Sequence, residues 1–281
     1  MNRKKSVFMK KNLLLTAFFM ASLLGFAQLK KQDTVMLKKV MELKVKGEGG
    51  ANGAAVTWDP VAKRYYSAIA GNADFPMSVF NASGMLISDS NLKTQVDVRG
   101  LWFNTKSKLL QANGYSETGW VTYSVNAKGI PETVTTLFEG MIQPNEHAVG
   151  TYDPKSNSVY FLDTSEDFVV ENYNAADGKI INTIFIHPGT TKAEDVDLDW
   201  DVEGMFDYNA TSVVFTGIPK SEIGLLNVVA NQVELFNFEG LLTKVLKLPQ
   251  DALAYEMFNF SYCNGIYWLF NKDTRTWLGY K

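Results

Sequence analysis

Polar side chains stand at the start of successive apolar segments of this chain, and their types suit acid–base chemistry or cation binding. They are Asn52, Asp97, Glu146 with His147, Asp201 or Glu203, and Glu256. Two carboxyl groups flanking a glycosidic bond can act as general acid and base. A ring of oxygen ligands would also suit Ca²⁺, and the remaining interpretation is a solvated rim of polar caps. The catalytic candidates are Glu146, His147, Glu203 and Glu256.

A second acidic set alternates carboxylates with apolar residues over 194–203. An EF-hand loop beginning at Asp195 would need glycine at its sixth place and glutamate at its twelfth. The chain has Trp200 and Phe206 there, so the EF-hand pattern fails. The alternation favours an extension of a strand, with its carboxylates in water. Cation binding is the functional alternative, and its candidate ligands are Asp195, Asp197, Asp199 and Asp201.

The chain has two histidines, which excludes a zinc site built from several histidines. His187 precedes Pro188 at the end of a predicted outer strand, and we expect it to be structural. His147 lies beside Glu146 and is the better candidate for an acid–base or Ser-His-Asp arrangement. The other interpretation of His147 is a hydrogen-bonded structural residue.

Aromatic residues interleave with polar ones in the segments predicted to be loops. Aromatic rings beside polar groups suit sugars or extended peptides, and they equally suit packing between neighbouring sheets. The predicted ligand-binding residues are Asn52, Phe75, Asp97, Arg99, Tyr115, Trp120 and Phe168.

A short turn signature recurs four times and predicts the elements that position these residues. A hydrophobic residue precedes asparagine, and glycine follows three or four places later, at Asn81–Gly84, Asn126–Gly129, Asn174–Gly178 and Asn237–Gly240. The asparagine side chain can accept backbone hydrogen bonds and glycine takes a positive φ, so each signature predicts a tight β-hairpin. The steps between the glycines are 45, 49 and 62 residues, which indicates a four-stranded unit of about 45 residues repeated around an axis.

Five such units account for the apolar segments. The last unit has only three strands before the chain stops, while Thr34–Lys46 has no hairpin partner of its own. We expect this segment to supply the missing outermost strand, because it would close the ring and cover an open edge. The sequence therefore predicts an all-β, five-bladed β-propeller as a single domain over 28–281. The expected blades are 53–90, 98–138, 146–188, 203–248, and 256–281 with the closing strand 34–46.

An apolar strand, an Asp-Pro turn and an aromatic-rich strand follow one another at Val56–Ala70 and again at Gly150–Leu162. This unit resembles the repeats of NHL- and YVTN-type β-propellers, and the likeness spans most of the chain after residue 27. Those relatives usually have six or seven blades, whereas this chain has segments for five. The resemblance implies a fold and no single activity, because that fold serves lectins, scaffolds, lyases and lactonases.

The connections of a propeller fall on two faces. The Asp-Pro turns and the Asn-to-Gly hairpins share one face, here called the turn face. The links between blades and the loops between second and third strands share the other, here called the variable-loop face. Binding sites gather where loops vary on a rigid scaffold, so we expect the site on the variable-loop face. Asp59 and Asp153 fall on the turn face and are predicted to be turn residues.

The first 27 residues have the pattern of a secretory signal peptide. Basic residues up to Lys11 precede the apolar run Leu13–Phe26, and small residues precede the expected cleavage after Ala27. The leader holds 5 of the 27 basic residues and none of the 30 acidic ones, which leaves 22 against 30, a net charge of −8. We expect a secreted or periplasmic protein with no nucleic-acid partner and no membrane insertion after leader removal.

Cys263 is the single cysteine, so stability must come from a packed core, and we expect Cys263 to be a buried small hydrophobe.

No cofactor is specified by the sequence, and calcium is the one that the acidic residues would suit. The leading prediction is an exported binding or interaction module whose partner is a carbohydrate, peptide or protein. The alternatives are a hydrolase or lyase acting on a sugar or lactone at the channel mouth, and a calcium-stabilised structural protein.

Overall fold

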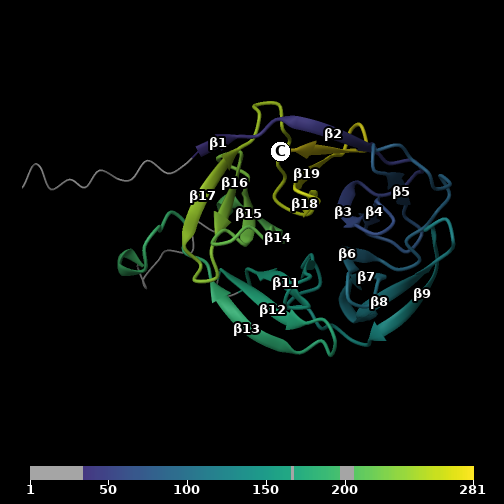
Figure 1. Cartoon of the computed structure of the whole chain (residues 1–281), viewed down its shortest axis with the longest axis horizontal. Helices are drawn as coiled ribbons and strands as arrows, with labels where there is room; N and C mark the ends of the chain where they lie inside the picture. Colours follow the sequence, from purple (N-terminus) through teal and green to yellow (C-terminus); the bar gives the residue numbers. More distant parts are fainter. Residues whose placement is uncertain (1–33, 166–167, 197–205) are drawn as a thin grey trace, which may run out of the picture. The chain divides into compact units, whose positions relative to one another are not determined.

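The computed structural model describes residues 34–165, 168–196 and 206–281, and Thr34–Lys281 form one compact unit. Its strands form five sheets arranged around a central axis (Figure 1). The prediction of an all-β, five-bladed propeller closed by an N-terminal strand is confirmed. Within the described ranges, no helix is long and apolar enough to cross a membrane.

Each blade is built from antiparallel strands that follow the chain from the axis outward, except that the outermost strand of the fifth blade comes from the N-terminal segment. The short 3-10 helices η1 (Ser116–Thr118) and η2 (Ala193–Asp195) lie in the connections. The blades are β3 (Asn52–Asp59), β4 (Arg64–Ala70) and β5 (Met77–Asn81); β6 (Val98–Asn104), β7 (Leu109–Gly114), β8 (Trp120–Val125) and β9 (Pro131–Phe138); β10 (Thr151–Asp153), β11 (Ser158–Asp163), β12 (Val169–Asn174) and β13 (Ile180–Phe185); β14 (Tyr208–Phe215), β15 (Ile223–Asn227), β16 (Gln232–Phe236) and β17 (Leu242–Lys247); and β18 (Phe260–Cys263), β19 (Ile266–Asn271) and β20 (Thr276–Tyr280) with β2 (Lys39–Lys44).

The first blade has three regular strands, although the sequence predicts a fourth at Met85–Ser88. That segment makes an isolated bridge between Phe80 and Leu86 instead of a continuous ladder. The hydroxyl of Ser88 accepts the hydrogen bond of the Val79 N–H at 3.0 Å. A side chain thus takes the place of the ladder carbonyl, and local side-chain bonds of this kind compete with strand pairing.

The N-terminal segment closes the ring and then crosses to the next blade. β2 pairs antiparallel with β20, with Leu43 opposite Trp277. β1 (Thr34–Met36) pairs in parallel with β17, the outer strand of the fourth blade, which the sequence did not indicate. Leu37 lies between the two strands, is 4% exposed, and donates its N–H to the carbonyl of Lys247 at 2.8 Å. One segment therefore covers the outer edges of two neighbouring sheets (Figure 1).

The predicted turn chemistry is present. The side-chain oxygen of Asn237 accepts hydrogen bonds from the N–H groups of Glu239 and Leu241, and Gly240 has a φ of +74°. On the Asp-Pro turns, Asp59 accepts from the N–H groups of Val61 and Ala62. Its carboxylate is engaged by the turn, as expected for a structural residue.

The core lies between neighbouring blades. Trp120 is fully buried, and its ring contacts Trp102 in its own blade and Phe161 and Tyr173 in the next, at centroid distances of 5.3, 5.7 and 6.4 Å. Rings at such separations attract one another beyond the area they bury. The position of Trp120 agrees with the packing interpretation of the interleaved aromatics.

The closing strand offers a matched pair of substitutions. Leu43 is fully buried and Val40 in the same strand is 51% exposed. We expect Leu43→Ala to lower the free energy of unfolding by about 2–5 kcal/mol, because it leaves a cavity where the ring closes. Val40→Ala should change it by no more than about 0.5 kcal/mol. Urea denaturation measures both, and equal effects would contradict the role of β2 in closure.

Candidate functional site

A cavity of about 400 Å³ opens at the variable-loop end of the channel. Such a volume lies within the range of small-molecule sites, roughly 300–1,000 Å³. It forms where the link between the fourth and fifth blades meets the start of β3 and the loop between β19 and β20. The described residues that line it are Asn52, Ala254, Tyr255, Glu256, Met257, Phe258 and Lys272.

Lys272 gives this cavity a positive charge, and the Tyr255 ring holds the lysine side chain in place. The Lys272 ammonium lies 4.2 Å from the centroid of the Tyr255 ring. The negative face of an aromatic ring attracts a cation, which restrains an otherwise flexible side chain. Glu256 supplies a carboxylate and Asn52 an amide to the same cavity. The lining therefore combines both charges, an amide and an aromatic ring.

Phe258 has an unusual backbone conformation at the wall of the cavity. It and Asn259 have φ values of +53° and +60°, which bulky residues rarely adopt. Three hydrogen bonds hold the turn: Thr211 Oγ1 accepts from the Phe258 N–H at 2.7 Å, Asn209 donates to the Phe258 carbonyl at 2.8 Å, and the Gly53 N–H donates to Asn259 Oδ1 at 2.8 Å. Strained backbone of this kind persists where its surroundings fix it, often at functional sites.

The fifth blade was predicted to begin at 256, but its first strand begins later, at Phe260. Two successive positive φ angles at Phe258 and Asn259 keep the preceding residues out of the strand. The partners that stabilise this conformation, Thr211 and Asn209, belong to the preceding blade. No local pattern points to them.

Arg99 forms a second feature at this end of the channel. It is 5% exposed and its guanidinium contacts both carboxylate oxygens of Asp97, with Nη2 3.2 Å from Oδ2. Its Cζ lies 4.5 Å from the centroid of the Tyr115 ring and 5.5 Å from that of Phe258. Within the described residues its Nε has no hydrogen-bond partner. The carboxylate and the two rings thus hold the guanidinium in a fixed, buried position.

Glu146 and His147 lie against the same aromatic rings. His147 Nε2 is 3.4 Å from Glu146 Oε1, and the imidazole ring is 5.6 Å from Tyr115 and 5.9 Å from Phe258. A hydrogen bond to the Glu146 carboxylate raises the pKa of the Tyr115 phenol, because the carboxylate favours the protonated phenol. These groups form a continuous cluster that reaches the cavity through Phe258.

The structure thus brings many of the predicted residues to one end of the channel. Glu256 and Asn52 line the cavity, but Glu146 and His147 are absent from its described lining, so the two predicted carboxylates do not share it. Glu203 lies outside the described residues. Tyr255, Lys272 and Phe258 are site residues that the sequence analysis missed.

None of the four predicted aromatics is in the described lining of the cavity, and Phe168 and Phe75 pack elsewhere. Phe168 is 4% exposed and packs on Tyr208 at a centroid distance of 5.1 Å. Phe75 packs over Gly49 and Gly50 in the segment before β3. Their positions fit the packing interpretation rather than a ligand platform.

The candidate cation ligands are only partly described. Asp195 ends the 3-10 helix η2, so the predicted strand extension is wrong at that residue; Asp197, Asp199 and Asp201 lie outside the described residues. Among the residues that are described, no group of three or more His, Cys, Asp or Glu side chains is arranged to hold a metal ion. The calcium hypothesis stays a prediction.

Comparison with known proteins adds to the fold and not to the chemistry. No protein family matches the chain, and no curated protein does. A gluconolactonase from Xanthomonas campestris is similar in structure, with a TM-score of 0.50 and 8% identity over 85% of this chain and 89% of that one. A chain of a nidogen/laminin complex matches with a TM-score of 0.40 and 12% identity over 69% of this chain and 63% of that one. The resemblance to propeller repeat proteins is confirmed at the level of the fold.

The contact between Tyr115 and Glu146 predicts a measurable titration. In Glu146→Gln we expect the pKa of Tyr115 to fall toward its ordinary value of 10.0, because a neutral amide no longer favours the protonated phenol. NMR of ¹³Cζ-labelled tyrosine across the alkaline range measures it. Glu117→Gln, in the adjacent helix η1, is the control and should leave the Tyr115 pKa unchanged. An unaltered pKa in Glu146→Gln would contradict the assigned contact.

Proposed function

We propose that this protein is an exported β-propeller that binds a small hydroxylated ligand of the carbohydrate class at the variable-loop end of its channel. The observation that carries the proposal is the lining of the cavity of about 400 Å³, which joins an aromatic ring to a carboxylate, an ammonium and an amide. Sugars present hydroxyl groups that both donate and accept, together with apolar C–H faces. Glu256 and Asn52 suit the first, and Tyr255 suits the second.

The site is restrained before any ligand arrives. Lys272 is held over Tyr255, and Phe258 is fixed by two hydrogen bonds to side chains of β14 in the fourth blade. A restrained site loses little conformational entropy on binding, which favours recognition of a small polar molecule. The buried Arg99 guanidinium packs against the Phe258 ring and adds to its restraint.

The second candidate function is that of a hydrolase or lyase that acts on a sugar or lactone. The contact of His147 with Glu146 favours it, because an imidazole and a carboxylate are groups that act as general acids and bases. Turnover of a lactone or glycoside that is lost in Glu146→Gln would support this candidate. Binding without turnover would support the first.

Export is the part of the proposal that rests on the leader. We expect cleavage after Ala27, so that the mature chain begins at Gln28. N-terminal sequencing of the protein recovered from periplasm and culture medium tests this, and recovery of the intact N-terminus would contradict it.

The ligand proposal predicts specific losses of affinity. Saturation-transfer NMR against neutral hexoses, hexuronates and disaccharides identifies binders, and calorimetry measures Kd. Glu256→Gln removes one charged hydrogen-bond acceptor and should weaken binding by about 10- to 100-fold. Tyr255→Ala should weaken it to a similar extent, because it removes both the ring and the support of Lys272.

Glu239→Gln is the matched control. Glu239 is exposed on a hairpin of the turn face, so the same change of charge there should leave Kd unaltered. Failure of every sugar in the panel to bind, or binding that Glu256→Gln and Tyr255→Ala leave intact, would overturn the proposal.

A further inference from the structure

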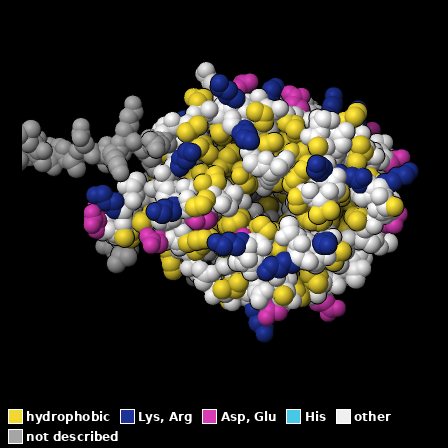
Figure 2. Space-filling model, in the orientation of Figure 1, with side chains coloured by type: hydrophobic (Ala, Val, Ile, Leu, Met, Phe, Trp, Pro, Cys, Tyr) yellow, Lys and Arg dark blue, Asp and Glu magenta, His cyan; other side chains and the backbone are white. Residues whose placement is uncertain are grey.

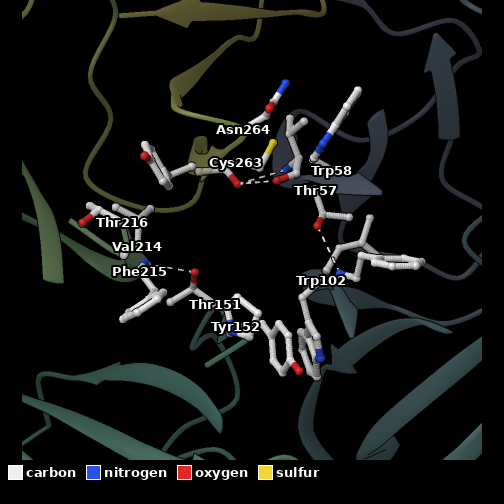
Figure 3. Close-up of a pocket in the computed structure, with 18 of the residues that line it drawn as sticks. Thr57, Trp58, Trp102, Thr151, Tyr152, Val214, Phe215, Thr216, Cys263 and Asn264 are labelled. Carbon is white, nitrogen blue, oxygen red and sulfur yellow. Dashed lines mark hydrogen bonds between the residues drawn. The ribbon is translucent and has the colours of Figure 1, made fainter. Parts of the chain in front are cut away.

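A second cavity, of about 310 Å³, lies at the turn-face end of the channel (Figure 3). It is lined by the ends of the innermost strands β3, β6, β10, β14 and β18 and by the turns that follow them, among them Pro60, Thr105, Pro154 and Gly217. Its described lining carries hydroxyl, backbone and aromatic groups and no charged side chain. The sequence analysis placed only repetitive turns on this face and expected no site here.

The turns around this cavity carry unpaired lysines. Five lysines on the turns 59–64, 104–109, 153–158 and 215–223 are exposed, and within the described part of the chain none of them forms a salt bridge. Figure 2 shows Lys and Arg side chains around the hollow at the centre of the ring, with Asp and Glu mainly toward its periphery. The five are Lys63, Lys106, Lys108, Lys155 and Lys220.

The carboxylates of the same turns are engaged by the turns themselves. Asp59 and Asp153 are 6% and 4% exposed and accept hydrogen bonds from backbone N–H groups of their own turns. Glu222 is half-buried and accepts from the Lys220 N–H at 2.8 Å. With Arg64, these turns hold six basic residues against three acidic ones, a net charge of +3, in a chain whose net charge after residue 27 is −8. Positive charge is therefore concentrated around this mouth of the channel.

Three of the lysines have a backbone conformation that lysine rarely adopts. The φ values of Lys63, Lys108 and Lys220 are +54°, +60° and +64°. Lys63 and Lys108 directly precede the second strand of their blades, and the equivalent residue of the third blade is Asn157, with a φ of +60°. Asparagine is enriched in this conformation and lysine is not. The turn itself therefore does not account for lysine at 63 and 108, and unfavourable backbone of this kind gathers at functional sites.

Two hydroxyl groups in the cavity keep a hydrogen-bond donor. Thr57 Oγ1 accepts from the Phe103 N–H and Thr151 Oγ1 from the Phe215 N–H, each at 3.1 Å (Figure 3). Neither hydroxyl has an acceptor of its own among the residues that the structure describes. Free O–H donors inside the cavity and ammonium groups around its mouth suit a ligand that presents several acceptor oxygens.

We propose that the turn-face cavity and the five lysines around it form a separate binding site for a small polyanion, a molecule with several carboxylate or phosphate oxygens. Cations around one concavity reinforce one another's potential and raise the local concentration of an anion. Thr57 and Thr151 then donate to an oxygen atom that enters the cavity, whose volume is at the lower end of the small-molecule range of roughly 300–1,000 Å³. The described linings of the two cavities share no residue, so this site does not rest on the carbohydrate proposal.

The test is calorimetry of the mature protein with two probes, inorganic triphosphate and citrate. We expect one saturable site per chain for at least one probe, and the lower Kd identifies phosphate or carboxylate as the preferred group. The double variant Lys63→Asn/Lys108→Asn should raise that Kd at least tenfold, because it removes two charges and introduces the residue type that suits a positive φ. Raising NaCl from about 0.05 to about 0.3 M should weaken binding at least fivefold, since exposed charges are screened.

The double variant Lys46→Asn/Lys192→Asn is the matched control, since it makes the same change of charge at exposed residues outside these turns. It should leave the Kd within twofold of the wild-type value. Thr151→Val should raise the Kd at least threefold and Thr151→Ser, which keeps the hydroxyl, should not, while circular dichroism shows that all variants remain folded. The proposal is overturned if neither probe binds the wild-type protein saturably, if the two double variants weaken binding equally, or if Thr151→Val binds as tightly as Thr151→Ser.

Discussion

Closure of the ring by β2 against β20 is the interaction on which both ends of the channel depend. The fifth sheet combines the N-terminal strand β2 with the C-terminal strands β18 to β20, so it is complete only when segments far apart in the sequence pair. Tyr255 and Lys272 at one end and Tyr262 at the other all belong to this blade or its entry. Neither cavity can have its shape in a chain whose first strand is displaced.

Side chains hold the blades together along the axis, where the innermost strands have an edge without a neighbouring ladder. Unpaired backbone groups are costly when buried. Thr57, Thr151 and Ser261 satisfy such groups toward the turn face, while Asn113 and Asn259 accept from the N–H groups of Gly150 and Gly53 toward the other. The same residues that stabilise the ring thereby decide which polar groups stay free for a ligand.

The two ends of one channel consequently differ in chemistry. At the turn face the described lining carries hydroxyl, backbone and aromatic groups and no charged side chain. At the variable-loop face Glu256, Lys272 and Arg99 bring charge, with aromatic rings holding the two cations. A charged group is favourable only where water or a partner reaches it, and the links between blades supply those partners.

Local sequence determined the parts of this protein that short-range physics controls. An asparagine and a glycine within one turn suffice for a hairpin, so the repeats, the number of blades and the unpaired first strand could be predicted. The spacing of Asp97 and Arg99 placed both at one strand entry. Only the tertiary structure decided the positive φ of Phe258, the contact of Lys272 with Tyr255, the burial of Trp120 and the cavity at the turn face. Each of these depends on residues from other strands or other blades, and contacts between distant segments form only when the ring closes.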